Sequence, residues 1–173
     1  KSLPELAPVV RVVHVDGKVG AALTNSKPDY IFVTGSTVTG KKIMQTAAEN
    51  LIPVTLELGS KDAAIVLEDA DIDSAARWIT WGAHFNSGQT CVAVERVYVV
   101  ESKYDEFVQA AVKYTEKIQS GFTLETNSPY SMGPITDPRQ IQIIDEHVKD
   151  AVANGARVLC GGRDHGDFYK PMV

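Results

Sequence analysis

The sequence has few cysteines and no long apolar run, and both features narrow what the chain can be. Its 173 residues include two cysteines, Cys91 and Cys160, so one disulfide at most can form. A thiol in a polar, glycine-containing stretch of a chain this large more often stays reduced. No apolar run is long enough to cross a bilayer, and no signal-peptide pattern is visible. We therefore expect a cytoplasmic protein with no membrane partner.

An excess of positive charge is also missing. The formal net charge is −5 at pH 7 and the basic residues are scattered, which argues against nucleic acid as a partner. There is no low-complexity tract and no internal repeat. Hydrophobic residues make up 44% and charged residues 23% of the chain, a balance typical of globular proteins. The length suits one ordinary domain or parts of two.

The first third of the chain alternates between strand-like and helical patterns. We predict strands at residues 9–15 and 30–33 and a third strand that starts at Pro53, with helices at residues 18–25 and 38–50. This order is typical of an α/β fold with a parallel sheet. Gly59 ends the third strand, and we place a domain boundary there.

The remainder of the chain predicts further strands and helices. We expect strands at residues 63–67, 96–100 and 156–160, and helices at residues 72–84, 103–119 and 139–154. Residues 121–138 form a long loop, which a compact domain seldom carries unless neighbouring segments hold it. Cys160, within an apolar strand, is expected to be an inert buried thiol.

The helix at residues 72–84 shows features that could suggest a ligand site but have simpler explanations. Asp69, Asp71 and Asp73 lack the glycine and distal glutamate of a calcium loop, so helix capping is preferred. Trp78 and Trp81 lie three positions apart, which favours packing in the core over a cofactor site. His84 has no other metal-binding side chain at ligand spacing, so we expect it to be structural and predict no metal site.

Two side chains are candidates for catalysis. Cys91 ends a polar loop, residues 85–91, that joins a helix to a strand, where catalytic groups tend to lie. Glu57 lies in an apolar strand, where an ionised carboxylate is costly unless it has a partner, so it is a candidate base. From the residues alone, an isolated cysteine is more often a core residue, and a strand glutamate more often lies at an edge or in an ion pair.

Several motifs resemble those of the aldehyde dehydrogenase superfamily. Residues 86–91 read Asn-Ser-Gly-Gln-Thr-Cys, like the family's nucleophile motif, and residues 56–61 read Leu-Glu-Leu-Gly-Ser-Lys, like its glutamate motif with Ser60 in place of a second glycine. Cys91 follows Glu57 by 34 positions (91 − 57), as in family members. Further matches occur in family order at residues 32–37, 68–73, 95–99, 104–107, 132–134 and 161–162.

The resemblance implies a fold and a reaction. Residues 1–59 would be the C-terminal part of a Rossmann-like NAD(P)-binding domain, and residues 60–173 the N-terminal part of the α/β catalytic domain. Cys91 would attack an aldehyde and form a thiohemiacetal and then a thioester, and Glu57 would activate the water that hydrolyses it. The resemblance also implies a homo-oligomer, dimer or tetramer.

The cofactor, NAD or NADP, would be bound at a turn between a strand and a helix. By the residues alone, Ser36 can be either an ordinary helix N-cap or part of an anion site at the N-terminus of the helix. The resemblance favours the second interpretation. It implies cofactor contacts by Gly35, Ser36, Gly40, Leu58 and Gly59, although no Gly-x-Gly-x-x-Gly fingerprint occurs in the chain.

The family pattern extends beyond this chain at both ends. The first cofactor-domain strands, the residues that hold the ribose, the oxyanion-hole asparagine and the rest of the catalytic domain are absent. We therefore expect a fragment that is inactive alone. Two alternatives stay open. One is an aldehyde dehydrogenase that passes the acyl group to coenzyme A, although relatives of that kind commonly lack a base at the position of Glu57. The other is a catalytically silent piece that serves assembly or binding.

Overall fold

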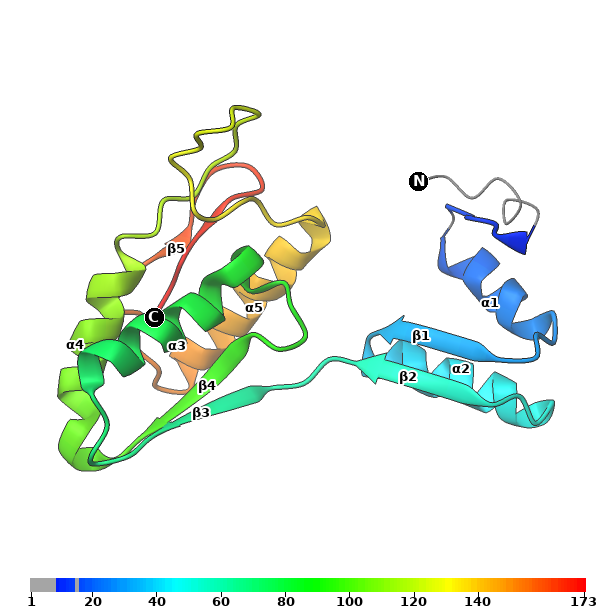
Figure 1. The fold of residues 1–173 in the computed structure, drawn as a ribbon, viewed down its shortest axis with the longest axis horizontal. Helices are drawn as coiled ribbons and strands as arrows, with labels where there is room; N and C mark the ends of the chain where they lie inside the picture. The colour runs from blue at the N-terminus through cyan, green and yellow to red at the C-terminus, as the bar shows by residue number, and fades with distance from the viewer. Residues whose placement is uncertain (1–8, 15) are drawn as a thin grey trace. The chain divides into compact units, whose positions relative to one another are not determined.

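The chain forms two compact units in the computed structural model, which describes residues 9–14 and 16–173 (Figure 1). One unit is Lys1–Gly59 and the other is Ser60–Val173. The structure contains helices together with small parallel sheets, so the predicted α/β class is confirmed. The assignment of the two units to a cofactor domain and a catalytic domain stays a prediction.

The first unit is built around a parallel βαβ arrangement. β1 (Ile31–Gly35) and β2 (Val54–Leu58) pair in parallel, and α2 (Thr37–Glu49) connects them and covers one face of the pair (Figure 1). Gly40 is buried in α2, and a Cβ built there would lie 2.7 Å from Cδ2 of Leu58. The missing side chain at Gly40 therefore lets α2 pack closely on β2.

The N-terminal part of this unit differs from the prediction. Helix α1 (Gly17–Asn25) forms as expected, and the Asp16 carboxylate caps it by accepting from the N–H groups of Lys18 and Val19. The predicted strand at residues 9–15 is wrong for residues 9–14, which form no strand, and Val15 lies outside the described residues. The valines at positions 9, 10, 12 and 13 are exposed, and β propensity alone cannot form a strand without a neighbouring strand to bond.

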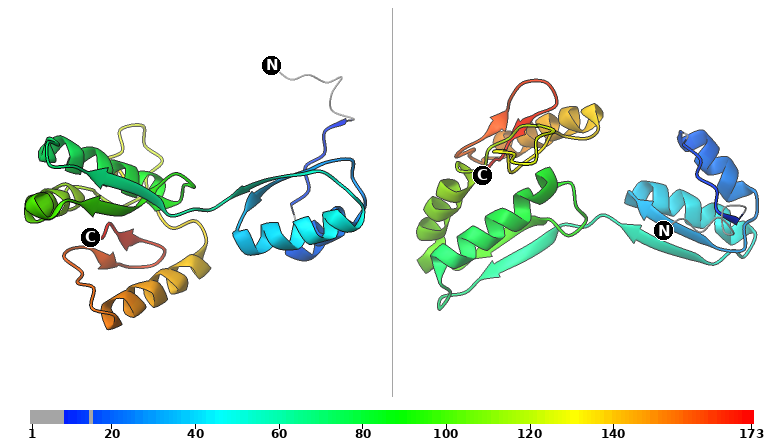
Figure 2. Two further views of the ribbon diagram at one scale, coloured as in Figure 1. Left: turned by 90° about the horizontal axis from the view of Figure 1, so that it is seen from below. Right: turned by 45° about the horizontal axis from the view of Figure 1, so that its top comes forward.

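The second unit begins with a parallel pair that two helices cover. β3 (Asp62–Val66) pairs with β4 (Val94–Val99), and helices α3 (Ile72–His84) and α4 (Tyr104–Thr115) lie side by side against them (Figure 2). Their core contains Val66, Ile72, Ala76, Phe107 and Ala111. The predicted strand at 63–67 and helix at 72–84 are confirmed, while α4 is shorter than predicted.

The predicted N-cap of α3 is confirmed, but its two tryptophans are not in the core as predicted. The Asp71 carboxylate accepts a hydrogen bond from the N–H of Ser74 at 3.3 Å. Trp78 and Trp81 are 58% and 57% exposed, so the prediction that they pack in the core is wrong. The buried face of α3 is formed by Ile72, Ala76 and Thr80, four residues apart, and the tryptophans lie off this stripe.

The C-terminal part of the second unit contains α5 (Pro138–Ala153) and an antiparallel pair, β5 (Gly162–Arg163) and β6 (Tyr169–Lys170). Ile135, Ile141 and Tyr169 form a second small core there. The predicted strand at residues 156–160 is wrong, because these residues lie in an irregular segment. Leu159 and Cys160 make backbone hydrogen bonds to Val173, and this contact is too short for a strand.

Two short 3₁₀ helices complete the second unit: η2 (Phe85–Gly88), which follows α3, and η3 (Glu101–Lys103), which precedes α4.

Within the described ranges, no helix combines the length and apolar character that a membrane span needs. Those residues also contain no group of three or more histidine, cysteine or acidic side chains placed to hold a metal ion.

Candidate active site

Cys91 is exposed in the segment between η2 and β4. Two consecutive backbone turns form this segment. The N–H of Gln89 donates to the carbonyl of Asn86 at 3.1 Å, and the N–H of Ala93 donates to the carbonyl of Thr90 at 3.2 Å. The second turn contains Cys91, so the thiol is carried by a hydrogen-bonded turn that faces solvent.

The first turn has an uncommon backbone conformation. Asn86, Ser87 and Gly88 have φ angles of 52°, 60° and 71°, so three consecutive residues are left-handed. For a residue with a side chain this conformation costs about 1–2 kcal/mol. Such conformations persist where surrounding contacts determine them. The sequence patterns did not predict this run.

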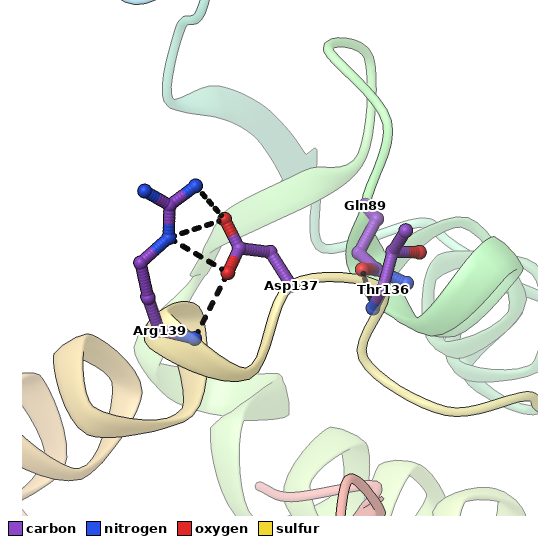
Figure 3. A network of polar contacts seen from close by, with 4 residues as sticks. All are labelled: Gln89, Thr136, Asp137 and Arg139. Atoms are coloured by element: carbon purple, nitrogen blue, oxygen red, sulfur yellow. Dashed lines mark hydrogen bonds and ion pairs between the residues drawn. The ribbon is translucent and has the colours of Figure 1, made fainter. Parts of the chain in front are cut away.

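Contacts with residues 133–136 hold the turn in place. The Ser87 hydroxyl donates to the carbonyl of Gly133 at 2.8 Å, and Nε2 of Gln89 donates to the carbonyl of Pro134 at 3.3 Å. In return, the N–H of Thr136 donates to Oε1 of Gln89 at 2.8 Å (Figure 3). These contacts cross 45 to 47 positions of sequence.

The long loop at residues 121–138 is also held at its base. The N–H of Gly121 donates to the carbonyl of Met132 at 2.9 Å, and the N–H of Met132 donates to the carbonyl of Gln119 at 3.2 Å. The prediction that neighbouring segments hold this loop is therefore confirmed. The motif at residues 132–134 matches the family in order, but the sequence assigns it no role in holding the loop.

The strand that follows Cys91 is fixed to the start of β3. Nη2 and Nε of Arg96 donate to the carbonyl of Lys61 at 2.7 and 3.1 Å, and the Lys61 ammonium pairs with the Glu95 carboxylate. Ser60, which replaces a motif glycine, donates its hydroxyl to Asp62 at 2.6 Å and does not have a positive φ. The serine is therefore compatible with the backbone at this position.

Glu57 lies on β2 in the first unit, opposite Thr34 of β1 and next to the last residue of the strand. Its side chain is exposed. The expectation that apolar neighbours enclose Glu57 is therefore wrong for this chain. The reason is strand geometry: alternate side chains point to opposite faces, and α2 covers the face that Leu58 occupies.

The predicted cofactor residues lie close together in the first unit. Gly35 and Leu58 are register partners at the ends of two parallel strands, so Gly35, Ser36, Leu58 and Gly59 meet at one edge of the sheet. Ser36 caps α2, and its hydroxyl accepts from the N–H of Thr39 at 3.2 Å. Gly40 lies at the end of the first turn of α2 and packs against Leu58, so its missing side chain serves helix packing.

Two other titratable groups of the second unit, His84 and Cys160, are partly buried. His84 is half-buried, burial lowers its pKa, and its Nε2 lies 3.5 Å from Oγ1 of Thr115. Cys160 is half-buried, and burial raises the pKa of its thiol. These surroundings agree with the structural interpretation of His84 and contrast with the exposure of Cys91.

Comparison with known proteins gives consistent matches along the chain. A family model described as the aldehyde dehydrogenase family matches residues 4–173. The chain is 40% identical over 166 residues to 4,4'-diapolycopene aldehyde oxidase of a Methylomonas species, which covers 95% of this chain and 30% of that protein. It thus spans about a third of the length of the curated relatives it matches.

Solved structures give the same result. The aldehyde dehydrogenase of Mycobacterium tuberculosis, complexed with NAD⁺, matches with a TM-score of 0.83 and 34% identity, covering 90% of this chain and 33% of that one. The NADP-dependent glyceraldehyde-3-phosphate dehydrogenase of Bacillus halodurans, complexed with NADP, matches with a TM-score of 0.82 and 37% identity, covering 92% and 33%. By sequence and by fold, the chain belongs to the aldehyde dehydrogenase family.

Proposed function

We propose that the full-length protein oxidises an aldehyde to a carboxylic acid with NAD or NADP, with Cys91 as the nucleophile. The observation that carries the proposal is the exposed thiol of Cys91 in a hydrogen-bonded turn of a chain that belongs to this family. Residues 1–59 would then be part of the cofactor domain, and residues 60–173 the thiol-bearing part of the catalytic domain.

The thiolate of Cys91 attacks the aldehyde carbon, and the carbonyl oxygen becomes an oxyanion. A backbone N–H near the thiol can stabilise this charge. Across residues 9–14 and 16–173, no acceptor within the protein takes the hydrogen of the Cys91 N–H. This N–H group is therefore free to donate to the oxyanion of the thiohemiacetal.

The edge of the first sheet suits the anionic part of a dinucleotide. Gly35 and Ser36 lie where β1 ends, and the N–H groups of Thr37 and Val38 in the first turn of α2 have no partner within the helix. This turn contains no acidic residue, so it attracts phosphate through the partial positive charge of the helix end. When bound, NAD(P)⁺ would supply the acceptor for the hydride that the thiohemiacetal carbon loses as the oxyanion collapses to a thioester on Cys91.

Glu57 is suited to activate water. Its exposed carboxylate has no ion-pair partner among the residues that the structure describes. A carboxylate without such a partner can accept a proton from a water molecule as that water attacks the thioester on Cys91. The acyl group then leaves as a carboxylate, and the thiol is free again.

Steady-state kinetics of variants of the full-length protein test the proposal. We expect Cys91→Ala to abolish aldehyde oxidation and Glu57→Gln to slow it on the order of 10²-fold to 10⁴-fold, the range for removal of a positioned base. Cys160→Ala is the matched control and should keep wild-type activity. Retention of aldehyde oxidation by Cys91→Ala would remove Cys91 from the mechanism.

A further inference from the structure

The side chain of Gln89 joins two segments that are far apart in sequence. Its Nε2 donates to the carbonyls of Asn86 and Pro134, at 3.1 and 3.3 Å, and its Oε1 accepts from the N–H of Thr136 at 2.8 Å. One half-buried amide thus uses its donor and acceptor ends together. Gln89 lies two residues before Cys91.

The segment that Gln89 contacts is itself held firmly. Ile135 is buried in the second core of the unit, and its N–H donates to the carbonyl of Asp167 at 2.8 Å. Asp137 caps α5 by accepting from the N–H of Arg139 at 3.0 Å, and the Arg139 guanidinium also pairs with its carboxylate (Figure 3). Residues 133–137 therefore form a supported segment beside a backbone turn that would not be stable alone.

The turn needs this support because of its conformation. Asn86 and Ser87 both have positive φ angles, which residues with side chains seldom adopt. The amide of Asn86 closes the turn by donating to the carbonyl of Gln89 at 3.2 Å. The hydroxyl of Ser87 makes the second contact with the supported segment, at Gly133.

We propose that Gln89 is a positioning residue that sets the place of the Cys91 thiol by hydrogen-bonding the turn to residues 134–136. Ser87 is the second contact in the same role. The expected effect of Gln89 on catalysis rests on the proposed function. The expected effect of Gln89 on the turn concerns this chain alone. Because Gln89 acts through the backbone, its loss should lower the rate of the covalent step and leave aldehyde binding nearly unchanged.

Gln89→Met tests the role, since methionine has a similar length and can make none of the three hydrogen bonds. Amide hydrogen exchange in the 173-residue chain should become at least about 10-fold faster at Gln89 and Thr136. In the full-length protein, kcat should fall on the order of 10-fold to 100-fold, as expected for a nucleophile displaced by about 1 Å. KM should stay within about 2-fold.

Gln89→Glu separates the two ends of the amide. The carboxylate keeps an acceptor for the N–H of Thr136 but cannot donate to Asn86 or Pro134. Exchange of the Thr136 amide should therefore stay slow in Gln89→Glu and become fast in Gln89→Met. Exchange of the backbone amide at position 89 should become fast in both variants. A role limited to filling space would leave the exchange at Thr136 the same in the two variants.

Two more variants keep the test decisive. Ser87→Ala should speed exchange in the turn even if Gln89→Met fails to fold, and Gln142→Met, at an exposed position on α5, should change neither exchange nor kcat. Unchanged exchange at Gln89 and Thr136 in folded Gln89→Met would overturn the positioning role. If the wild-type protein oxidises no aldehyde, the proposed function fails, and the exchange data still decide whether Gln89 holds the turn.

Discussion

Replacement of Gly88 by alanine tests whether the turn before Cys91 is left-handed. Gly88 has a φ of 71°, and a Cβ built there would lie 3.2 Å from the carbonyl oxygen of Ala83. The left-handed conformation costs a residue with a side chain about 1–2 kcal/mol. The close backbone contact adds to this cost, because the last turn of α3 must shift to relieve it.

We expect Gly88→Ala to lower the free energy of unfolding of the second unit by about 2 kcal/mol. With a urea m-value of about 1–3 kcal/mol/M for a unit of this size, the unfolding midpoint should fall by about 1 M. Gly133→Ala is the control, because a Cβ at Gly133 has no atom within 4 Å and the φ angle is not in the left-handed region. It should change stability by less than about 0.5 kcal/mol.

Tryptophan fluorescence measures the unfolding of the second unit, which contains Gly88. The only two tryptophans of the chain, Trp78 and Trp81, lie on α3, so their emission reports unfolding of the second unit even if the two units unfold separately. Gly88→Asn should lose less stability than Gly88→Ala, because asparagine tolerates the left-handed region better. Equal midpoints for Gly88→Ala and wild type would refute the left-handed turn.

Three further predictions concern reactivity, capping and pH. Iodoacetamide at neutral pH should label Cys91 well before Cys160, because Cys160 is half-buried and its pKa is raised, and equal rates measured by mass spectrometry on folded protein would contradict this. Asp71→Ala should lower the urea midpoint by an amount equivalent to about 1 kcal/mol, the usual effect of losing an N-cap. Hydrogen bonds from Arg139 lower the pKa of Asp137 below its ordinary value of 3.8, so the stability this carboxylate contributes is present above pH 3.8 and is lost as the pH falls through its folded pKa. Acid titration of helical circular dichroism should show this loss in wild type and not in Asp137→Asn.

The sequence predicts those helices and strands that combine a local pattern with a neighbouring element to pack against or to bond. The boundaries of α3 followed from Asp71 at its N-cap and from apolar residues at helical spacing. The segments at residues 9–14 and 156–160 have equally good local strand patterns, yet they form no strand. A strand depends on hydrogen bonds to a neighbour, and a local pattern carries no information about that neighbour.

Burial was harder to predict than secondary structure. The spacing of Trp78 and Trp81 predicts that they pack in the core, but the packed face of α3 is set by Ile72 and Ala76. Glu57 was expected among apolar neighbours and is exposed instead, because strand side chains alternate between the two faces of a sheet. Residue type gives the average burial of a side chain, while its direction depends on what packs against the element.

The sequence indicated Cys91 but not what holds it in place. The contacts of Ser87 and Gln89 reach residues 133–136, more than 40 positions away, and no spacing rule predicts such pairs. The only sequence signal was indirect: a long loop rich in glycine and proline required an anchor. Its partners became visible only in the folded chain.

The most direct measurement of the central claim is the mass of the peptide that contains Cys91 after reaction with an aldehyde and NAD(P)⁺. In the full-length Glu57→Gln variant, loss of the base should stop turnover after one hydride transfer per site, because the thioester forms but hydrolyses slowly. We predict a burst of NAD(P)H and a mass increase equal to one acyl group on Cys91, with Cys160 unmodified. An unmodified Cys91 after a stoichiometric burst would contradict the account.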